Sequence, residues 1–225
     1  MSTEHLLAVT ATVVITAALV TAAKLRPGPW TRIACIALAV ILVGAEVSWL
    51  IYNERTSADL TSALPFQLCD AAIFIAAAAL VLRSQLLVEV TYYWGLAGTI
   101  QAVITPDLPQ HFPSFPFLQY YVAHGGIVAA ALFLVVGLGQ WPRRNSVLRV
   151  LLITILYALM VGAIDAATGA NYMYLRSKPQ SASLLDLFGP WPFYIGWAAL
   201  VGATLLLILD APFRWLRARR QEHTF

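Results

Sequence analysis

The chain passes from a polar loop into an apolar run at Leu64-Pro65-Phe66-Gln67-Leu68-Cys69-Asp70. The apolar run continues to Leu82, and its first residues include an amide, a thiol and a carboxyl group. A polar group in the hydrocarbon core of a bilayer costs several kcal/mol unless it is paired or functional. These three side chains therefore mark the start of this run as a candidate functional site.

The composition of the chain is that of a membrane protein. Hydrophobic residues make up 60% of the 225 residues and charged residues 11%, whereas charged residues are about 25% of a soluble domain. A helix of about 20 apolar residues is long enough to cross a bilayer. Seven such runs predict an all-α fold, a seven-transmembrane helix bundle that forms one domain over residues 1–225, with spans at about 5–23, 33–51, 66–82, 86–104, 118–138, 147–167 and 191–209.

The basic residues predict the orientation of these spans, because Lys and Arg collect in cytoplasmic loops. Three of the 14 fall on one side of the alternating spans, namely Arg55, Arg176 and Lys178. The others fall on the opposite side: Lys24, Arg26, Arg32, Arg83, Arg143, Arg144, Arg149, Arg214, Arg217, Arg219 and Arg220. We therefore predict a multi-pass protein of the plasma membrane with its N-terminus outside and its C-terminus in the cytoplasm. These loops account for the net charge of +3 without a nucleic-acid partner.

The first apolar run is interpreted as a retained helix. No Lys or Arg precedes it, and Lys24 and Arg26 follow it, which is the reverse of the order in a secretory signal peptide.

Polar residues inside the predicted spans share one depth. In the predicted orientation they lie in the outer half of the bilayer and come from five runs: Glu46, Gln67, Cys69, Asp70, Gln101, His124 and Asp165. Glu89, near the inner end of its run, is the exception. Scattered polar residues have no reason to share a layer, so the pattern predicts a polar pocket between helices.

Cys69 and His124 are the candidate catalytic pair. Cys35 lies near the opposite face, too far for a disulfide, which needs Cα atoms within about 7 Å. A thiolate is a strong nucleophile when a nearby histidine takes its proton. The two positions differ in depth by roughly 5 Å at about 1.5 Å per residue, and general-base catalysis needs them in contact. The alternative interpretation of Cys69 is a small packing residue.

Further candidates surround this pair. A carboxylate could orient the imidazole, and Asp70, Asp165 and Asp186 are the candidates. Arg176 and Lys178 could hold a headgroup phosphate or contact headgroups non-specifically. Ser183 and Asp186 match a capping box, which predicts a short interfacial helix. The four histidines (His5, His111, His124 and His223) lack metal-ligand spacing, and no glycine-rich phosphate loop is present, so no metal or cofactor is predicted.

Five blocks of sequence carry a resemblance to a known family. They are Leu64-Pro65-x-Gln67-Leu68-Cys69; Tyr93-Trp94-Gly95-Leu96-x-Gly98 with Gln101 and Pro106-Asp107-Leu108; Phe112-Pro113 through Ala123-His124-Gly125; Gly169-x-Asn171-Tyr172-Met173-Tyr174-Leu175; and Leu184-Leu185-Asp186-Leu187-x-Gly189-Pro190-Trp191-Pro192. From the third run to the end of the seventh, the chain resembles the bacterial YwaF-like integral membrane proteins. The first two runs match no family that we can name.

The YwaF-like family is similar to an animal membrane family that transfers fatty acyl chains onto lysophospholipids with a cysteine nucleophile and a histidine partner. The resemblance therefore implies that Cys69 is the nucleophile and His124 its partner. The chain departs from the pattern at Gln67, where many relatives have histidine, so one proton carrier is missing.

Two functional hypotheses follow. The first is a lipid acyltransferase or acyl hydrolase that forms a thioester on Cys69 from phospholipid or lysophospholipid near the outer leaflet. Gln67 or Asn171 would donate to the oxyanion, with Gln101 as a further orienting candidate. The second is a seven-helix binding or transport protein in which Glu46, Asp70 and Asp165 carry protons or hold an ion. The sequence shows neither the inverted repeat nor the broken midplane helix of many transporters.

Overall fold

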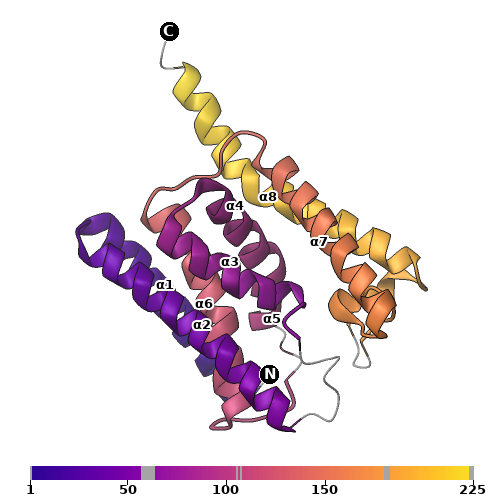
Figure 1. Ribbon diagram of the computed structural model, residues 1–225. Coiled ribbons are helices and arrows are strands. Elements are labelled where there is room, and N and C mark those ends of the chain that lie inside the picture. Colours follow the sequence, from indigo (N-terminus) through magenta and orange to yellow (C-terminus); the bar gives the residue numbers. More distant parts are fainter. Residues whose placement is uncertain (1, 57–63, 105, 107, 180–182, 223–225) are drawn as a thin grey trace. The chain divides into compact units, whose positions relative to one another are not determined.

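The computed structural model describes residues 2–56, 64–104, 106, 108–179 and 183–222 (Figure 1). These residues form helices and no strand, as the all-α prediction expected. Five helical stretches among them are long and apolar enough to cross a membrane. They are α1 (Thr3–Leu25), α2 (Trp30–Thr56), α6 (Phe115–Leu132) with the π-helix η3 (Phe133–Gly137), α7 (Ser146–Thr168) and α8 (Phe193–Glu222). The protein is therefore a multi-pass membrane protein.

The third and fourth predicted spans take less regular forms. The third is α3 (Leu68–Leu82), with 15 residues. The fourth is divided into α4 (Gln85–Tyr93), the π-helix η2 (Trp94–Thr99) and α5 (Ile100–Ile104). Gly95 and Gly98 both lie in the π-helical turns of η2. The count of seven spans and the orientation of the termini remain predictions.

The chain divides into two compact units. The first contains residues 1–58 and 68–141, and the second contains residues 59–67 and 142–225. That they act as one domain remains a prediction.

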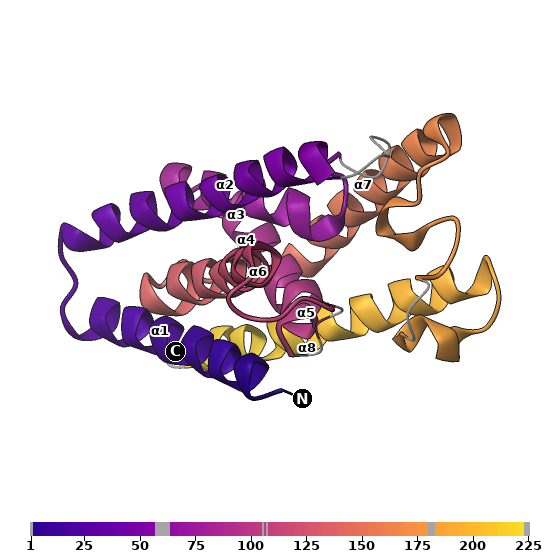
Figure 2. The same cartoon turned by 90° about the horizontal axis from the view of Figure 1, so that it is seen from below.

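Helix α6 is the centre of the first unit. It packs against α1, α2, α3, α4 and η2, and Figure 2 shows it between α1 and α2. Two glycines allow this close packing. A Cβ atom on Gly125 would lie 2.8 Å from Oγ1 of Thr12, and a Cβ atom on Gly126 would lie 2.8 Å from Leu42. The residue after His124 is therefore fixed against α1.

The second unit contains α7 and α8 with two short 3₁₀ helices between them, η4 (Tyr172–Tyr174) and η5 (Leu184–Phe188). The start of η5 forms the predicted capping box, in which the Asp186 carboxylate accepts the Ser183 N–H at 2.8 Å. The predicted interfacial helix is thus a single 3₁₀ segment.

The segment before α3 is held by η4 and α7. The Tyr157 hydroxyl donates to the Phe66 carbonyl at 3.0 Å. Oε1 of Gln67 accepts the Met173 N–H at 2.9 Å. Phe66 also packs on Tyr172 in the apolar core of this unit. These contacts fix the loop that leads to Cys69.

Candidate functional site

Cys69 lies in the first turn of α3, next to Asp70. Its thiol is free and half-buried. The Thr99 hydroxyl, at the end of η2, lies within hydrogen-bonding range of the thiol. Thr99 is buried, and its hydroxyl donates to the Trp94 carbonyl at 3.4 Å. Sequence reasoning missed Thr99, although two glycines just before it gave a signal of irregular backbone, and π-helical turns are frequent at functional sites.

Two contacts fix the register between η2 and α6. A Cβ atom on Gly95 would lie 3.2 Å from Cγ2 of Ile127. Seven residues later in the chain, the Ala102 carbonyl accepts a hydrogen bond from the Tyr120 hydroxyl at 2.9 Å. Residue numbers rise along one helix as they fall along the other, so the two helices are antiparallel.

This register places Thr99 level with His124. Both lie between the two contacts just described, and each residue advances a helix by about 1.5 Å. His124 is also three residues before Ile127, which puts it on the same face of α6. Because Thr99 is beside the thiol of Cys69, the three side chains occupy one level of the first unit.

The His124 ring has a defined tautomer. Its Nδ1 lies 2.9 Å from the Tyr120 carbonyl, and a carbonyl can only accept, so Nδ1 carries the hydrogen and Nε2 keeps its lone pair. The ring is stacked on the Tyr120 ring, with 4.1 Å between centroids. Among the described residues no hydrogen bond joins His124 to Cys69, and their catalytic contact remains a prediction.

Two carboxylates accompany the thiol. Glu46 on α2 is 1% exposed, and its Oε1 has no hydrogen-bond partner among the described residues. Glu46 and Asp70 lie within electrostatic range of each other and of Cys69. The structure thus brings together three residues of the predicted polar layer.

Gln101 lies on α5, two residues after Thr99. It is exposed, unlike the buried Thr99. Its role as an orienting residue remains a prediction.

Three predicted residues of the second unit hold the loop after α7. Oδ1 of Asp165 accepts the Tyr172 N–H at 2.9 Å. Oδ1 of Asn171 accepts the N–H groups of Arg176 and Ser177, and its amide donates to the Ser177 carbonyl at 2.9 Å. Nη1 of Arg176 donates to the carbonyl oxygens of Asp165 and Ala170 at 3.3 Å each. All three therefore have a structural role.

Lys178 and Asp186 also contact each other. Their charged atoms are 3.8 Å apart, and the Lys178 ammonium lies 5.6 Å from the centre of the Tyr194 ring. The roles that the sequence predicted for these residues at a lipid headgroup or an imidazole remain predictions.

Replacing Asp165 tests its structural role. Asp165→Ala is expected to destabilise the protein by roughly 1–3 kcal/mol, because the Tyr172 N–H would be buried without a partner. Asp165→Asn keeps the Oδ1 acceptor and should fold and retain part of the activity. Thermal unfolding of the three proteins in one detergent measures the difference. Equal melting temperatures for Asp165→Ala and the wild type would contradict this role.

An apolar groove of about 510 Å³ lies in the first unit between α1, α2 and α6. It extends along α1 from Glu4 to Leu19, which is roughly 22 Å of helix at 1.5 Å per residue. Several of its lining side chains are exposed on the apolar surface, including Leu7, Ile15 and Ile41. The groove therefore opens sideways, toward where the hydrocarbon of a bilayer would lie.

Comparison with known proteins identifies one family. Residues 1–210 match the model of the TMEM164 family, a family of animal membrane proteins. The match begins before the first two helices, for which the sequence had suggested no relative. No curated protein and no solved structure matches the chain. The animal side of the resemblance is supported, whereas the YwaF-like and bacterial assignments remain predictions. Asp107 and His223, named in the sequence patterns, lie outside the described residues.

Proposed function

The chain belongs to the TMEM164 family, and from that premise we propose that it transfers or hydrolyses fatty acyl groups of phospholipids through a thioester on Cys69. The proposal is supported by the register between η2 and α6, which puts Thr99, the neighbour of the Cys69 thiol, at about the level of His124. The defined tautomer of His124 adds to it, because Nε2 is available to accept a proton.

The proposed reaction has two halves. His124 takes the proton of the Cys69 thiol, and the thiolate attacks the carbonyl carbon of a lipid ester. The ester C–O bond breaks, the leaving oxygen takes the proton from His124, and the acyl group stays on sulfur as a thioester. A lysolipid hydroxyl or water then loses its proton to His124, attacks the thioester and regenerates the thiol.

The developing oxyanion needs hydrogen-bond donors. The first N–H groups of an α-helix have no partner within the helix, and Cys69 and Asp70 occupy that position in α3. The two candidates from sequence, Gln67 and Asn171, belong to the second unit.

The apolar groove supports a lipid as the substrate. Its length of roughly 22 Å along α1 suits an extended acyl chain, and its lining is almost entirely apolar. Phospholipids and lysophospholipids are therefore the proposed partners. Arg176 and Lys178 belong to the second unit, and their roles at a headgroup remain predictions.

The proposal is tested by intact-protein mass spectrometry after incubation with a phospholipid carrying defined acyl chains. The wild type should gain the mass of one acyl group, and hydroxylamine should remove it, because a thioester is cleaved by that reagent. Cys69→Ala should gain nothing, whereas Cys35→Ala should behave as the wild type. An adduct on Cys69→Ala would contradict the proposal.

A second candidate function rests on Glu46. A buried carboxylate without a partner, close to Asp70, is also what a proton- or ion-coupled binding or transport protein uses. In that case Glu46→Gln would abolish uptake of a solute into vesicles and Cys69→Ala would not. Loss of acyl-enzyme formation in Cys69→Ala, with no solute uptake by the wild type, would exclude it.

A further inference from the structure

A basic cavity of about 410 Å³ lies in the second unit, where the start of α7 faces the C-terminal part of α8. It is lined by Arg144, Asn145, Asp210, Arg214, Arg217 and Ala218. Three arginines and one aspartate give this lining a net charge of +2. The cavity is far along the chain from Cys69 and plays no part in the proposed reaction.

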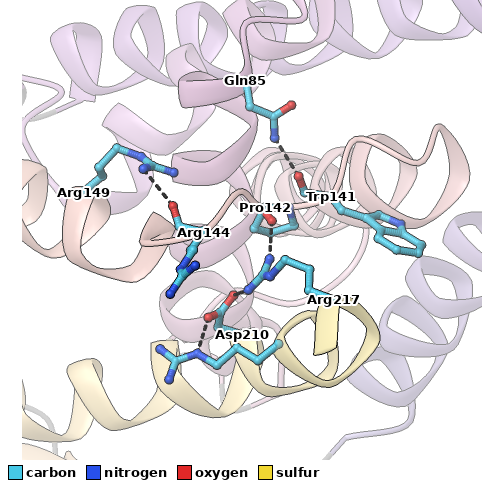
Figure 3. Close-up of polar contacts among 8 residues, drawn as sticks. Gln85, Trp141, Pro142, Arg144, Arg149, Asp210 and Arg217 are labelled. Carbon is cyan, nitrogen blue, oxygen red and sulfur yellow. Dashed lines mark hydrogen bonds and ion pairs between the residues drawn. The ribbon is translucent and has the colours of Figure 1, made fainter. Parts of the chain in front are cut away.

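A buried carboxylate orients two of the arginines. Asp210 is 2% exposed. Its Oδ2 accepts Nε of Arg214 at 2.6 Å and its Oδ1 accepts Nη2 of Arg217 at 3.2 Å. Nη1 of Arg217 also donates to the Pro142 carbonyl at 2.6 Å (Figure 3). Arg214 bonds only through Nε, so its two Nη groups have no hydrogen-bond partner within the described part of the chain.

The third arginine, Arg144, lies in the turn that precedes α7. Figure 3 shows the Arg144 side chain extending from the start of α7 toward Asp210, with no bond drawn from its guanidinium. No other described residue pairs with that group, while the Arg144 carbonyl accepts Nη1 of Arg149 at 3.0 Å. This hydrogen bond holds the backbone of Arg144, and the Arg144 guanidinium group is available to contact a ligand.

The first turn of α7 adds positive potential to the same cavity. Asn145 precedes the helix with φ 61° and ψ 19°, and its side chain makes no capping hydrogen bond. The N–H groups at the start of a helix carry a partial positive charge and favour an anion. The guanidinium donors that have no partner in the described part of the chain and the start of α7 therefore both favour an anion.

We propose that this cavity binds a phosphate monoester, carried either by the headgroup of an anionic lipid or by a soluble phosphate ester. The planar donors of arginine match phosphate oxygens, and a phosphate monoester with a charge of about −1.5 to −2 complements the cavity. Basic residues that only orient a protein in the membrane need neither a cavity nor a buried carboxylate to align them. None of the lining residues takes part in the proposed acyl transfer, so this site goes beyond the proposed function.

The test uses the full chain in detergent and native mass spectrometry. Dioctanoyl phosphatidic acid is the probe, and dioctanoyl phosphatidylcholine is the comparison lipid, because its phosphate is a diester with a neutral headgroup. Arg144→Gln/Arg214→Gln removes the two arginines with open donors. The matched control is Arg219→Gln, since Arg219 lies on the same helix outside the cavity and contacts the Trp215 ring instead.

The wild type should retain phosphatidic acid in preference to phosphatidylcholine. The double variant should bind it at least about tenfold more weakly, and Arg219→Gln should bind as the wild type does. Displacement by millimolar inorganic phosphate identifies a soluble ester as the source, and the absence of displacement identifies the lipid headgroup. Equal weakening by Arg219→Gln, or no preference for phosphatidic acid, would overturn the proposal.

Discussion

Alkylation of Cys69 by iodoacetamide at neutral pH is expected to slow by roughly tenfold or more in His124→Ala. The reagent reacts with the thiolate, and a histidine that takes the thiol proton increases the fraction of thiolate. His124 is the histidine at the level of the thiol, and its Nε2 can take the proton.

The experiment is best done in Cys35→Ala, which leaves Cys69 as the single cysteine of the chain. Nη2 of Arg83 lies 3.6 Å from the Cys35 sulfur. A nearby cation changes the reactivity of a thiol, so Cys35 is not a suitable reference for Cys69. The matched control is His111→Ala, because His111 is exposed and pairs with Glu4 at 3.3 Å. If His124→Ala and His111→Ala leave the rate equally unchanged, Cys69 is a packing residue and the acyl-enzyme mechanism fails.

Gly125→Ala is expected to destabilise the first unit by roughly 1–3 kcal/mol through overpacking. The new Cβ would lie 2.8 Å from Oγ1 and 3.1 Å from Cγ2 of Thr12, and α6 would have to move away from α1. The better helix propensity of alanine, worth about 1 kcal/mol, offsets only part of this cost. The apparent melting temperature in detergent measures the effect.

A second substitution makes this prediction specific. Thr12→Ala removes both crowded atoms, so Gly125→Ala/Thr12→Ala should recover most of the lost stability. Gly44→Ala on α2 is the control, because nothing lies within 4 Å of a Cβ atom there, and it should not lower the melting temperature. Additive effects of the two substitutions would show that Gly125 and Thr12 are not in contact.

The long helices were predictable because hydropathy alone decides them. The runs at α1, α2 and α7 differ from the predicted spans by a few residues at each end. The interruption at η2 was not predicted, since Gly95 and Gly98 are also common in regular membrane helices. Within η2, Gly95 packs against Ile127 of α6. A contact between residues this far apart in the chain cannot be read from the local sequence.

The candidate site was predicted in part. Position along the predicted spans grouped Glu46, Cys69 and Asp70, and these three lie within electrostatic range of one another. Thr99 escaped notice because a threonine in an apolar helix is usually satisfied by its own backbone. The loop contacts of Asn171 and Arg176 could not be foreseen, since they depend on the fold of the chain after α7.

The sideways opening of the groove between α1 and α2 changes how any ligand for it should be measured. A molecule reaches such a groove by dissolving first in the bilayer, so the concentration that matters is its mole fraction among the lipids. An inhibitor of this groove would become weaker when more vesicles are added at constant total inhibitor, although its affinity for the protein stays the same. Two inhibitors that bind equally well would differ in apparent potency by the ratio of their partition coefficients.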